Sequence, residues 1–182
     1  MSIDHCTLYS LFEQAALQFP KLIAVEEEST GKQFTYEQIL KESRILAAEI
    51  DNEMNGSMTL PDDVPNQLVC ILMDRSCRAI VAMLAVLSLG AAYVPIDPSF
   101  PEDRQLHILS HSRCPVAVVE KRFVEKFEQM TGDDVQIPKL IVVEEETLNR
   151  TDRAVSRKPI SPFENKLAYV LYTSGSTVSS HD

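Results

Sequence analysis

The sequence predicts an α/β fold in which helices flank a mostly parallel sheet. Short, continuously apolar runs recur along the chain, as expected for strands that are buried on both faces. Longer helix-like segments lie between these runs, so the elements alternate as they do in right-handed βαβ units. Hydrophobic residues make up 45% of the 182 residues, which is enough to fill a core and argues against a disordered chain.

The first part of the chain is expected to form a helix, a hairpin and a second helix. Thr7 is a suitable N-cap for a helix whose apolar residues recur at three- and four-residue steps and which ends before Pro20. Gly31 indicates a turn between two short apolar runs, which is typical of a hairpin. In order, the predicted segments are a helix over 8–19, strands over 22–25 and 33–35, a helix over 36–49 and a surface loop over 51–66.

From residue 67 onward the pattern alternates between buried strands and helices. Ser76 begins one of these helices, and Gly90 occupies the position of its C-cap. Residues 146–166 are charged and contain two prolines, and a connection of this length without periodicity predicts a flexible loop. The predicted strands are 68–73, 91–96, 116–119, 140–143 and 167–172, and the helices are 76–89, 101–112 and 121–130.

Charge and composition exclude several classes of partner. Lys and Arg total 17 against 27 Asp and Glu, a net charge of −10, so neither a nucleic acid nor an anionic membrane is an expected partner. The N-terminus lacks the features of a signal peptide, and no apolar run approaches the roughly 20 residues of a membrane span. A cytoplasmic protein is predicted. Cys70 and Cys77 fit small core residues, and a disulfide framework is not expected.

The sequence contains none of the common catalytic and metal-binding motifs. No Walker A, G-x-G-x-x-G, G-x-S-x-G or H-E-x-x-H pattern occurs, so no catalytic residue is predicted. His107 and His111, with Cys114 nearby, could form the edge of a metal site, but a fourth ligand is missing. A pair of surface imidazoles is therefore favoured, and no metal ligand is predicted. Glutamates at 26–28 and 144–146 follow strands and are interpreted as solvated strand ends.

One segment has the composition of a phosphate-binding loop. It follows the predicted strand 167–172, and ligands of open α/β sheets bind beyond the carboxyl ends of strands. Its hydroxyl groups and its glycine allow several hydrogen bonds to phosphate oxygens at close backbone approach. The alternative is an ordinary polar turn. The candidate nucleotide-binding residues are Thr173, Ser174, Gly175, Ser176 and Thr177.

Three separated segments, in order, carry a family resemblance. Residues 34–39 read FTYEQI, residues 87–98 read LSLGAAYVPIDP and are followed by PEDR, and residues 167–177 read LAYVLYTSGST. These segments resemble the core motifs of the amino-acid adenylation domains of nonribosomal peptide synthetases, which belong to the acyl-adenylate-forming ligases. The region over 97–101 also resembles stand-alone β-alanyl-amine synthetases of the Ebony type.

The resemblance implies a ligase that joins a carboxylic or amino acid to ATP with Mg²⁺, forming an acyl-adenylate and pyrophosphate. The acyl group would then pass to the phosphopantetheine thiol of a carrier protein. In this family the segment matching 173–177 forms the phosphate loop. Such a loop positions the nucleotide and stabilises charge, without forming a covalent bond itself.

The sequence departs from the family pattern directly after Thr177. The family continues with Gly-x-Pro-Lys-Gly, whereas residues 178–182 read VSSHD, so the phosphate-binding lysine is missing. We therefore expect residues 1–182 to be a truncated N-terminal portion of an AMP-binding domain that is inactive alone. The alternative is a non-catalytic truncation product that binds a nucleotide or a partner, with self-association through an exposed sheet edge.

Overall fold

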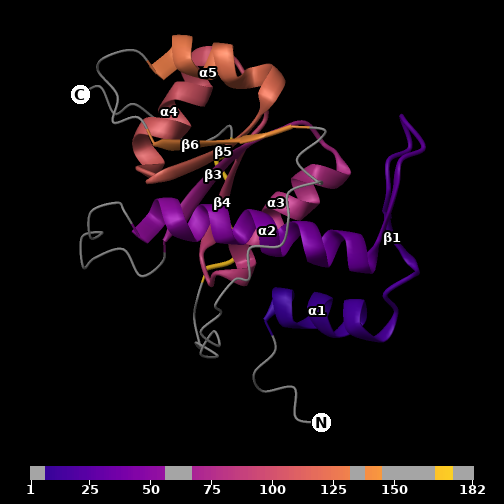
Figure 1. Ribbon diagram of the computed structural model, residues 1–182. Helices are drawn as coiled ribbons and strands as arrows, with labels where there is room; N and C mark the ends of the chain where they lie inside the picture. The colour runs from indigo at the N-terminus through magenta and orange to yellow at the C-terminus, as the bar shows by residue number, and fades with distance from the viewer. Residues whose placement is uncertain (1–6, 56–66, 132–137, 145–166, 174–182) are drawn as a thin grey trace.

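A four-stranded parallel sheet forms the centre of the fold (Figure 1). The computed structural model describes residues 7–55, 67–131, 138–144 and 167–173. The strands lie in the order β4-β3-β5-β6, and every neighbouring pair is parallel. Their bounds are β3 Leu68–Leu72, β4 Ala92–Ile96, β5 Val116–Glu120 and β6 Lys139–Val143. The predicted fold class is confirmed.

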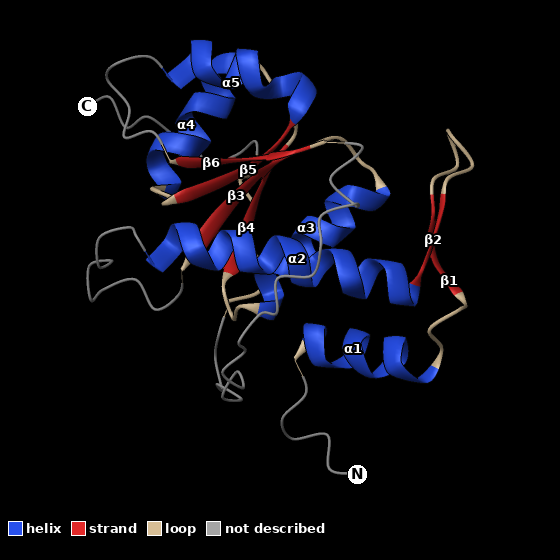
Figure 2. Cartoon of the chain, in the orientation of Figure 1, coloured by secondary structure: helices blue, strands red, loops and turns tan. Residues whose placement is uncertain are grey.

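Helices cover both faces of this sheet (Figure 2). Successive side chains of β3 point to opposite faces of the sheet. Val69 and Ile71 belong to one core cluster, and Cys70 and Leu72 belong to the other. The first cluster includes side chains of α2 (Tyr36–Asn55) and α3 (Cys77–Ser88). The second includes side chains of α4 (Glu102–Ser112) and α5 (Val124–Thr131), which follows the short 3₁₀ helix η1 (Lys121–Phe123).

The N-terminal helix and hairpin pack outside the α2–α3 layer. In α1 (Leu8–Gln18), the Thr7 hydroxyl accepts a hydrogen bond from the Ser10 amide at 3.0 Å, so the predicted cap is confirmed. The hairpin consists of β1 (Ile23–Glu26) and β2 (Gln33–Thr35), which pair antiparallel as predicted. Gly31 has a φ of 66°, which explains the glycine in this turn.

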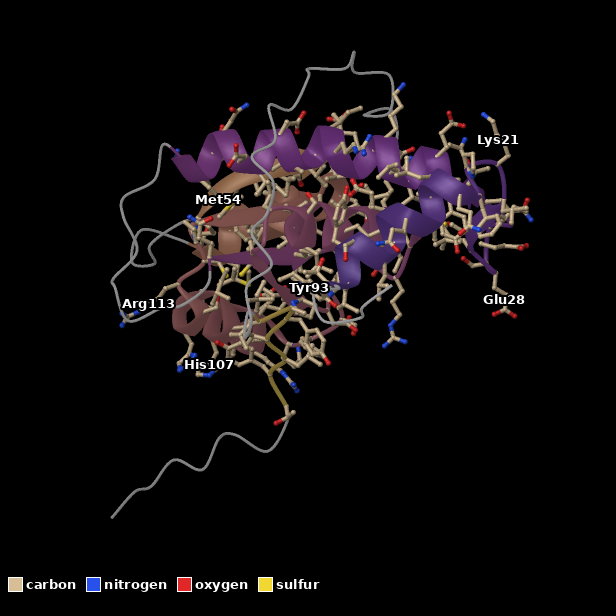
Figure 3. The ribbon with its side chains drawn as sticks, turned by 90° about the horizontal axis from the view of Figure 1, so that it is seen from below. Lys21, Glu28, Met54, Tyr93, His107 and Arg113 are labelled. Carbon is tan, nitrogen blue, oxygen red and sulfur yellow. The ribbon has the colours of Figure 1, made fainter. Side chains whose placement is uncertain are left out.

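Helix α2 is longer than the sequence analysis predicts. It continues through Asn55, so the expectation that residues 51–66 form a loop is wrong for residues 51–55. The reason is that the buried stripe extends one more turn, because Met54 follows Ile50 at a four-residue step and both are buried (Figure 3 labels Met54). Residues 56–66 lie outside the described part, as do residues 146–166, where the flexible loop is predicted.

The predicted strand 167–172 is an extended segment with one β-bridge to the outer edge of β4. Tyr93 pairs in parallel with Tyr169: the Tyr93 amide donates to the Ala168 carbonyl at 3.2 Å, and the Val170 amide donates to Tyr93 at 3.0 Å. The next donor on this edge would be Pro95, which has no amide hydrogen. The ladder therefore lacks this hydrogen bond, and the structure shows one bridge. Within the described residues, no helix is long and apolar enough to cross a membrane.

Candidate functional site

The structure describes only the first residue of the predicted phosphate loop. Thr173 follows the extended segment, whereas Ser174, Gly175, Ser176 and Thr177 lie outside the described residues. The assignment of these five residues to nucleotide binding therefore stays a prediction. The segment that leads into them is described, and its contacts define where the loop begins.

Arg104 contacts Tyr172, the residue directly before the predicted phosphate loop and here called the entry to the loop. Its Nη2 donates to the Tyr172 carbonyl at 3.2 Å, and its guanidinium carbon lies 4.1 Å from the centre of the Phe100 ring. Arg104 belongs to the first turn of α4, which follows the carboxyl end of β4. Thr173 therefore comes next to the carboxyl edge of the sheet, where ligands of open α/β sheets bind.

Two histidines of α4 contact the same segment. His111 Nδ1 lies 2.7 Å from the Tyr172 hydroxyl, and the rings of His107 and His111 stack with centres 5.7 Å apart. Tyr172 presents its ring edge-on to both imidazoles, and burial raises the pKa of its hydroxyl. Figure 3 labels His107. Both imidazoles are exposed, as predicted, and they also hold Tyr172 in place.

No metal centre is visible in the described part of the chain. No group of three or more His, Cys, Asp or Glu side chains there is arranged to hold a metal ion.

Replacing Arg104 should loosen the entry to the loop. Arg104→Met keeps an apolar stem against Phe100 but removes the charged donor to Tyr172, which is worth roughly 1.5–3 kcal/mol. We expect hydrogen exchange of the Val170 amide to accelerate by about tenfold or more, measured by mass spectrometry. Arg44→Met, which removes an ion pair with Glu13 at 3.1 Å on α1, is the control. Unchanged exchange at Val170 in Arg104→Met would show that the contact does not hold the segment.

A charged cavity lies at the carboxyl ends of β3, β5 and β6. The connection after β3 runs over one face of the sheet and that after β5 over the other, so this is a topological switch point. The cavity has a volume of about 770 Å³. Its lining residues come from the hairpin, the start of α3, η1 and the ends of β5 and β6: Glu27, Thr30, Lys32, Ser76, Arg78, Glu120, Lys121, Arg122, Val143 and Glu144.

Ion pairs lie along the wall of this cavity. Arg122 contacts Asp74 at 2.6 Å and Glu120 at 2.8 Å, and Lys121 contacts Glu144 at 3.0 Å. These pairs join the loops after β3, β5 and β6. The cavity wall carries both positive and negative side chains. Such a wall fits an ion-pair network that joins the loops, and it also fits the binding of a polar ligand.

Glu27 has a structural role that the sequence analysis missed. Its Oε1 accepts the Cys77 amide at 2.7 Å in the first turn of α3, and its Oε2 accepts the Thr30 hydroxyl at 2.7 Å. The backbone hydrogen bond from Cys77, followed by that from Thr30, lowers the pKa of this carboxyl. Glu27 does follow a strand and is partly exposed, as predicted, but it also holds the first turn of α3. The contact joins residues 50 positions apart, so no local pattern reveals it.

Glu42 is a partly buried carboxyl group of α2 that faces α3 and the end of β6. The residues around it are both apolar and charged: Ile45, Leu46, Glu49, Arg78, Val81, Val143 and Glu144. The Glu42 Oε2 makes no hydrogen bond to the described residues. Burial raises the pKa of Glu42 to about 7, although Arg78 and Lys41 act in the opposite direction. Glu42 can therefore exchange a proton near neutral pH.

The comparisons with known proteins agree on one family. The family described as "AMP-binding enzyme" matches residues 12–178. Nonribosomal peptide synthetase agiA of Aspergillus flavus is 36% identical over 180 residues, covering 97% of this chain and 2% of that protein. Tyrocidine synthase 1 of Brevibacillus parabrevis is 31% identical over 171 residues, covering 94% of this chain and 14% of that protein. The chain thus spans a small part of these relatives.

Solved structures of low sequence identity share the fold. A nonribosomal peptide synthetase, FmoA3, in a form bound to α-methyl-L-serine-AMP, matches with a TM-score of 0.71 at 20% identity, over 95% of this chain and 18% of that one. A putative long-chain-fatty-acid CoA ligase from Rhodopseudomonas palustris matches with a TM-score of 0.63 at 19% identity, over 79% and 34%. The resemblance to Ebony-type synthetases stays a prediction.

Proposed function

Because the chain belongs to the family of AMP-binding enzymes, we propose that it is part of an ATP-dependent ligase that activates a carboxylic or amino acid as an acyl-adenylate. The family match over residues 12–178, which includes the phosphate-loop residues 173–177, carries this proposal. The position of Thr173 beside the first turn of α4 supports it, because the loop then begins at the carboxyl edge of the sheet.

The phosphate loop would act through hydrogen bonds and charge stabilisation. Hydroxyl and amide groups of Thr173, Ser174, Gly175, Ser176 and Thr177 are donors of the kind that bind phosphate oxygens. ATP would enter with Mg²⁺, which neutralises phosphate charge. The acyl group would pass to a carrier protein, as the relation to nonribosomal peptide synthetases implies.

We expect the isolated 182-residue chain to be inactive in adenylation. Residues 178–182 lack the lysine that follows the loop in the family, so one positive charge is missing opposite several phosphate charges. The purified chain should give no ATP–pyrophosphate exchange with any of a panel of amino acids and β-alanine. A complete relative serves as the positive control. Exchange that Ser174→Ala abolishes would contradict this expectation.

The size and the exchange activity of the protein in its source test the ligase proposal. An antibody against residues 100–130 should detect a band far above 20.4 kDa, and the protein captured with it should catalyse the exchange. A large protein without exchange activity would contradict the proposed ligase. A stable band near 20.4 kDa would favour the second candidate function.

That second candidate is a non-catalytic protein that self-associates through the edge beyond β4. Side chains alternate along the extended segment: Val170 and Tyr172 pack against the core, whereas Leu167, Tyr169 and Leu171 are 49–60% exposed. A row of exposed apolar residues at a sheet edge favours association with another surface.

Leu171→Glu tests this candidate. If Leu171 is buried between two copies, the charge should raise the dissociation constant of the dimer by roughly tenfold or more, since burial of a leucine is worth about 1.5–3 kcal/mol. Sedimentation velocity over a concentration series measures the change. Leu17→Glu, at a leucine of α1 that is 68% exposed, is the matched control. A monomer at all concentrations, or equal effects of both substitutions, would exclude association through this edge.

A further inference from the structure

Two buried thiols and one hydroxyl form a cluster beneath α4. Cys70 lies in the middle of β3, and Cys114 lies between α4 and β5. The Ser112 Oγ is 3.5 Å from the Cys70 Sγ and 3.4 Å from the Cys114 Sγ. Ser112 donates its own proton to the Leu109 carbonyl at 3.2 Å and accepts a hydrogen bond from the Cys114 thiol. Two thiols that lie 44 residues apart in sequence therefore contact the same oxygen atom.

The cysteines share a closely packed environment. Both belong to the core cluster on the α4–α5 side of the sheet, where Cys70 is fully buried and Cys114 is 5% exposed. Cys77, the third described cysteine, belongs to the cluster on the opposite face, and its Sγ lies 3.9 Å from the Lys32 carbonyl. Cys70 and Cys114 thus differ from Cys77 in having another thiol as a neighbour.

The two thiols are also chemically unequal. A hydrogen bond to Cys114, with burial, raises the pKa of Cys70 well above its usual value, and the same hydrogen bond lowers the pKa of Cys114. Cys114 is the more exposed of the two thiols, so peroxide reaches it first and Cys70 is the resolving partner. The lowered pKa of Cys114 acts in the same direction, because the thiolate is the reactive form of cysteine.

We propose that Cys70 and Cys114 are a redox pair that hydrogen peroxide converts into an intramolecular disulfide. The Cys114 thiolate attacks a peroxide oxygen, which forms a sulfenic acid and releases one water after proton transfer. The Cys70 sulfur then attacks the Cys114 sulfur, the S–O bond breaks, and a second water leaves with the Cys70 proton. Two thiols are oxidised by two electrons, and one peroxide is reduced to two waters. The bond would tie β3 to the start of β5.

The test uses the folded 182-residue chain with Cys6 and Cys77 replaced by alanine, so that only the pair remains. After full reduction, the chain is treated with peroxide at neutral pH. We expect loss of both free thiols, a peptide map with Cys70 joined to Cys114, and full recovery with dithiothreitol. Persistent sulfinic acid, disulfides between chains, or two unreacted thiols in the folded chain would each overturn the proposal.

A matched control separates proximity from reactivity. The variant Cys6→Ala/Cys70→Ala retains Cys77 and Cys114, two buried thiols on opposite faces of the sheet. Circular dichroism first establishes that both variants are folded. We expect the Cys70–Cys114 chain to form its intramolecular disulfide at least about tenfold faster than this control, and the advantage to disappear in 8 M urea, because proximity in the fold sets the rate. Equal rates in the folded chains would overturn the proposal.

Discussion

Phe127→Ala should destabilise the chain by about 3–5 kcal/mol, which is the range for truncating a buried aromatic side chain. Phe127 is 1% exposed and is among the largest fully buried side chains in the described part of the chain. Its ring packs α5 against the face of the sheet formed by Cys70, Leu72 and Val94. A domain of this kind is stable by only about 5–15 kcal/mol, so the loss is a large part of the total.

Urea unfolding measures this loss as a shift of the midpoint at constant slope. Phe123→Ala is the matched control, because Phe123 lies at the start of the same helical segment but is only half buried. Its ring packs against the Arg122 guanidinium, with 4.8 Å between the guanidinium carbon and the ring centre. We expect this control to cost well under half as much. Equal losses of unfolding free energy in the two variants would show that Phe127 does not contribute more than Phe123 to the packing of α5.

Most of the architecture follows from local patterns that the sequence displays. Continuous apolar runs indicated all four sheet strands, and Thr7 and Ser76 indicated the starts of α1 and α3, where both cap the first turn. Hydroxyl caps act within three residues, so they can be recognised without tertiary information. The end of α2 was missed because Asp51 and Asn52 resemble loop residues, while Met54 is buried by contacts from distant segments.

The outer edge of β4 carries a sequence feature, Pro95, that bears on the pairing of segment 167–172. Ala92 donates its amide to Gln67 on the β3 side at 2.9 Å, so Tyr93 and Pro95 point their backbone groups to the opposite edge. A proline at the second of these positions removes one ladder hydrogen bond, which disfavours a regular strand beside it. The sequence therefore contained one reason to expect weak pairing of segment 167–172.

For the candidate site, too, local features could be predicted and contacts between distant segments could not. The position of the phosphate loop after an apolar run could be predicted, because both features are local. The contacts of Arg104 with Tyr172, Glu27 with Cys77, and Cys70 with Cys114 could not be predicted from spacing, because each joins segments far apart in sequence. Such contacts depend on the order of strands in the sheet, which periodicity does not specify.

Glu42 should make the folded chain less stable as the pH rises through neutrality. Its pKa is about 7 in the folded chain and near 4.5 when the chain is unfolded and the carboxyl is solvated. Between these two values the folded state binds the extra proton, so stability is full below about pH 4.5 and is lost as the pH rises toward 7. Because the side chain is partly exposed, solvent screening reduces the loss to roughly 1–2 kcal/mol.

Glu42→Gln should remove this dependence, because the amide is neutral at every pH and nearly the same shape. We expect the variant to match the original chain near pH 4.5 and to exceed it by roughly 1–2 kcal/mol at pH 8, in urea unfolding at both values. Glu37→Gln, at the exposed start of the same helix where Glu37 pairs with Lys21, controls for the loss of one negative charge. Parallel pH profiles of the original chain and Glu42→Gln would mean that the carboxyl is already ionised in the fold. The other titrating groups are common to both chains, so the difference between the profiles isolates Glu42.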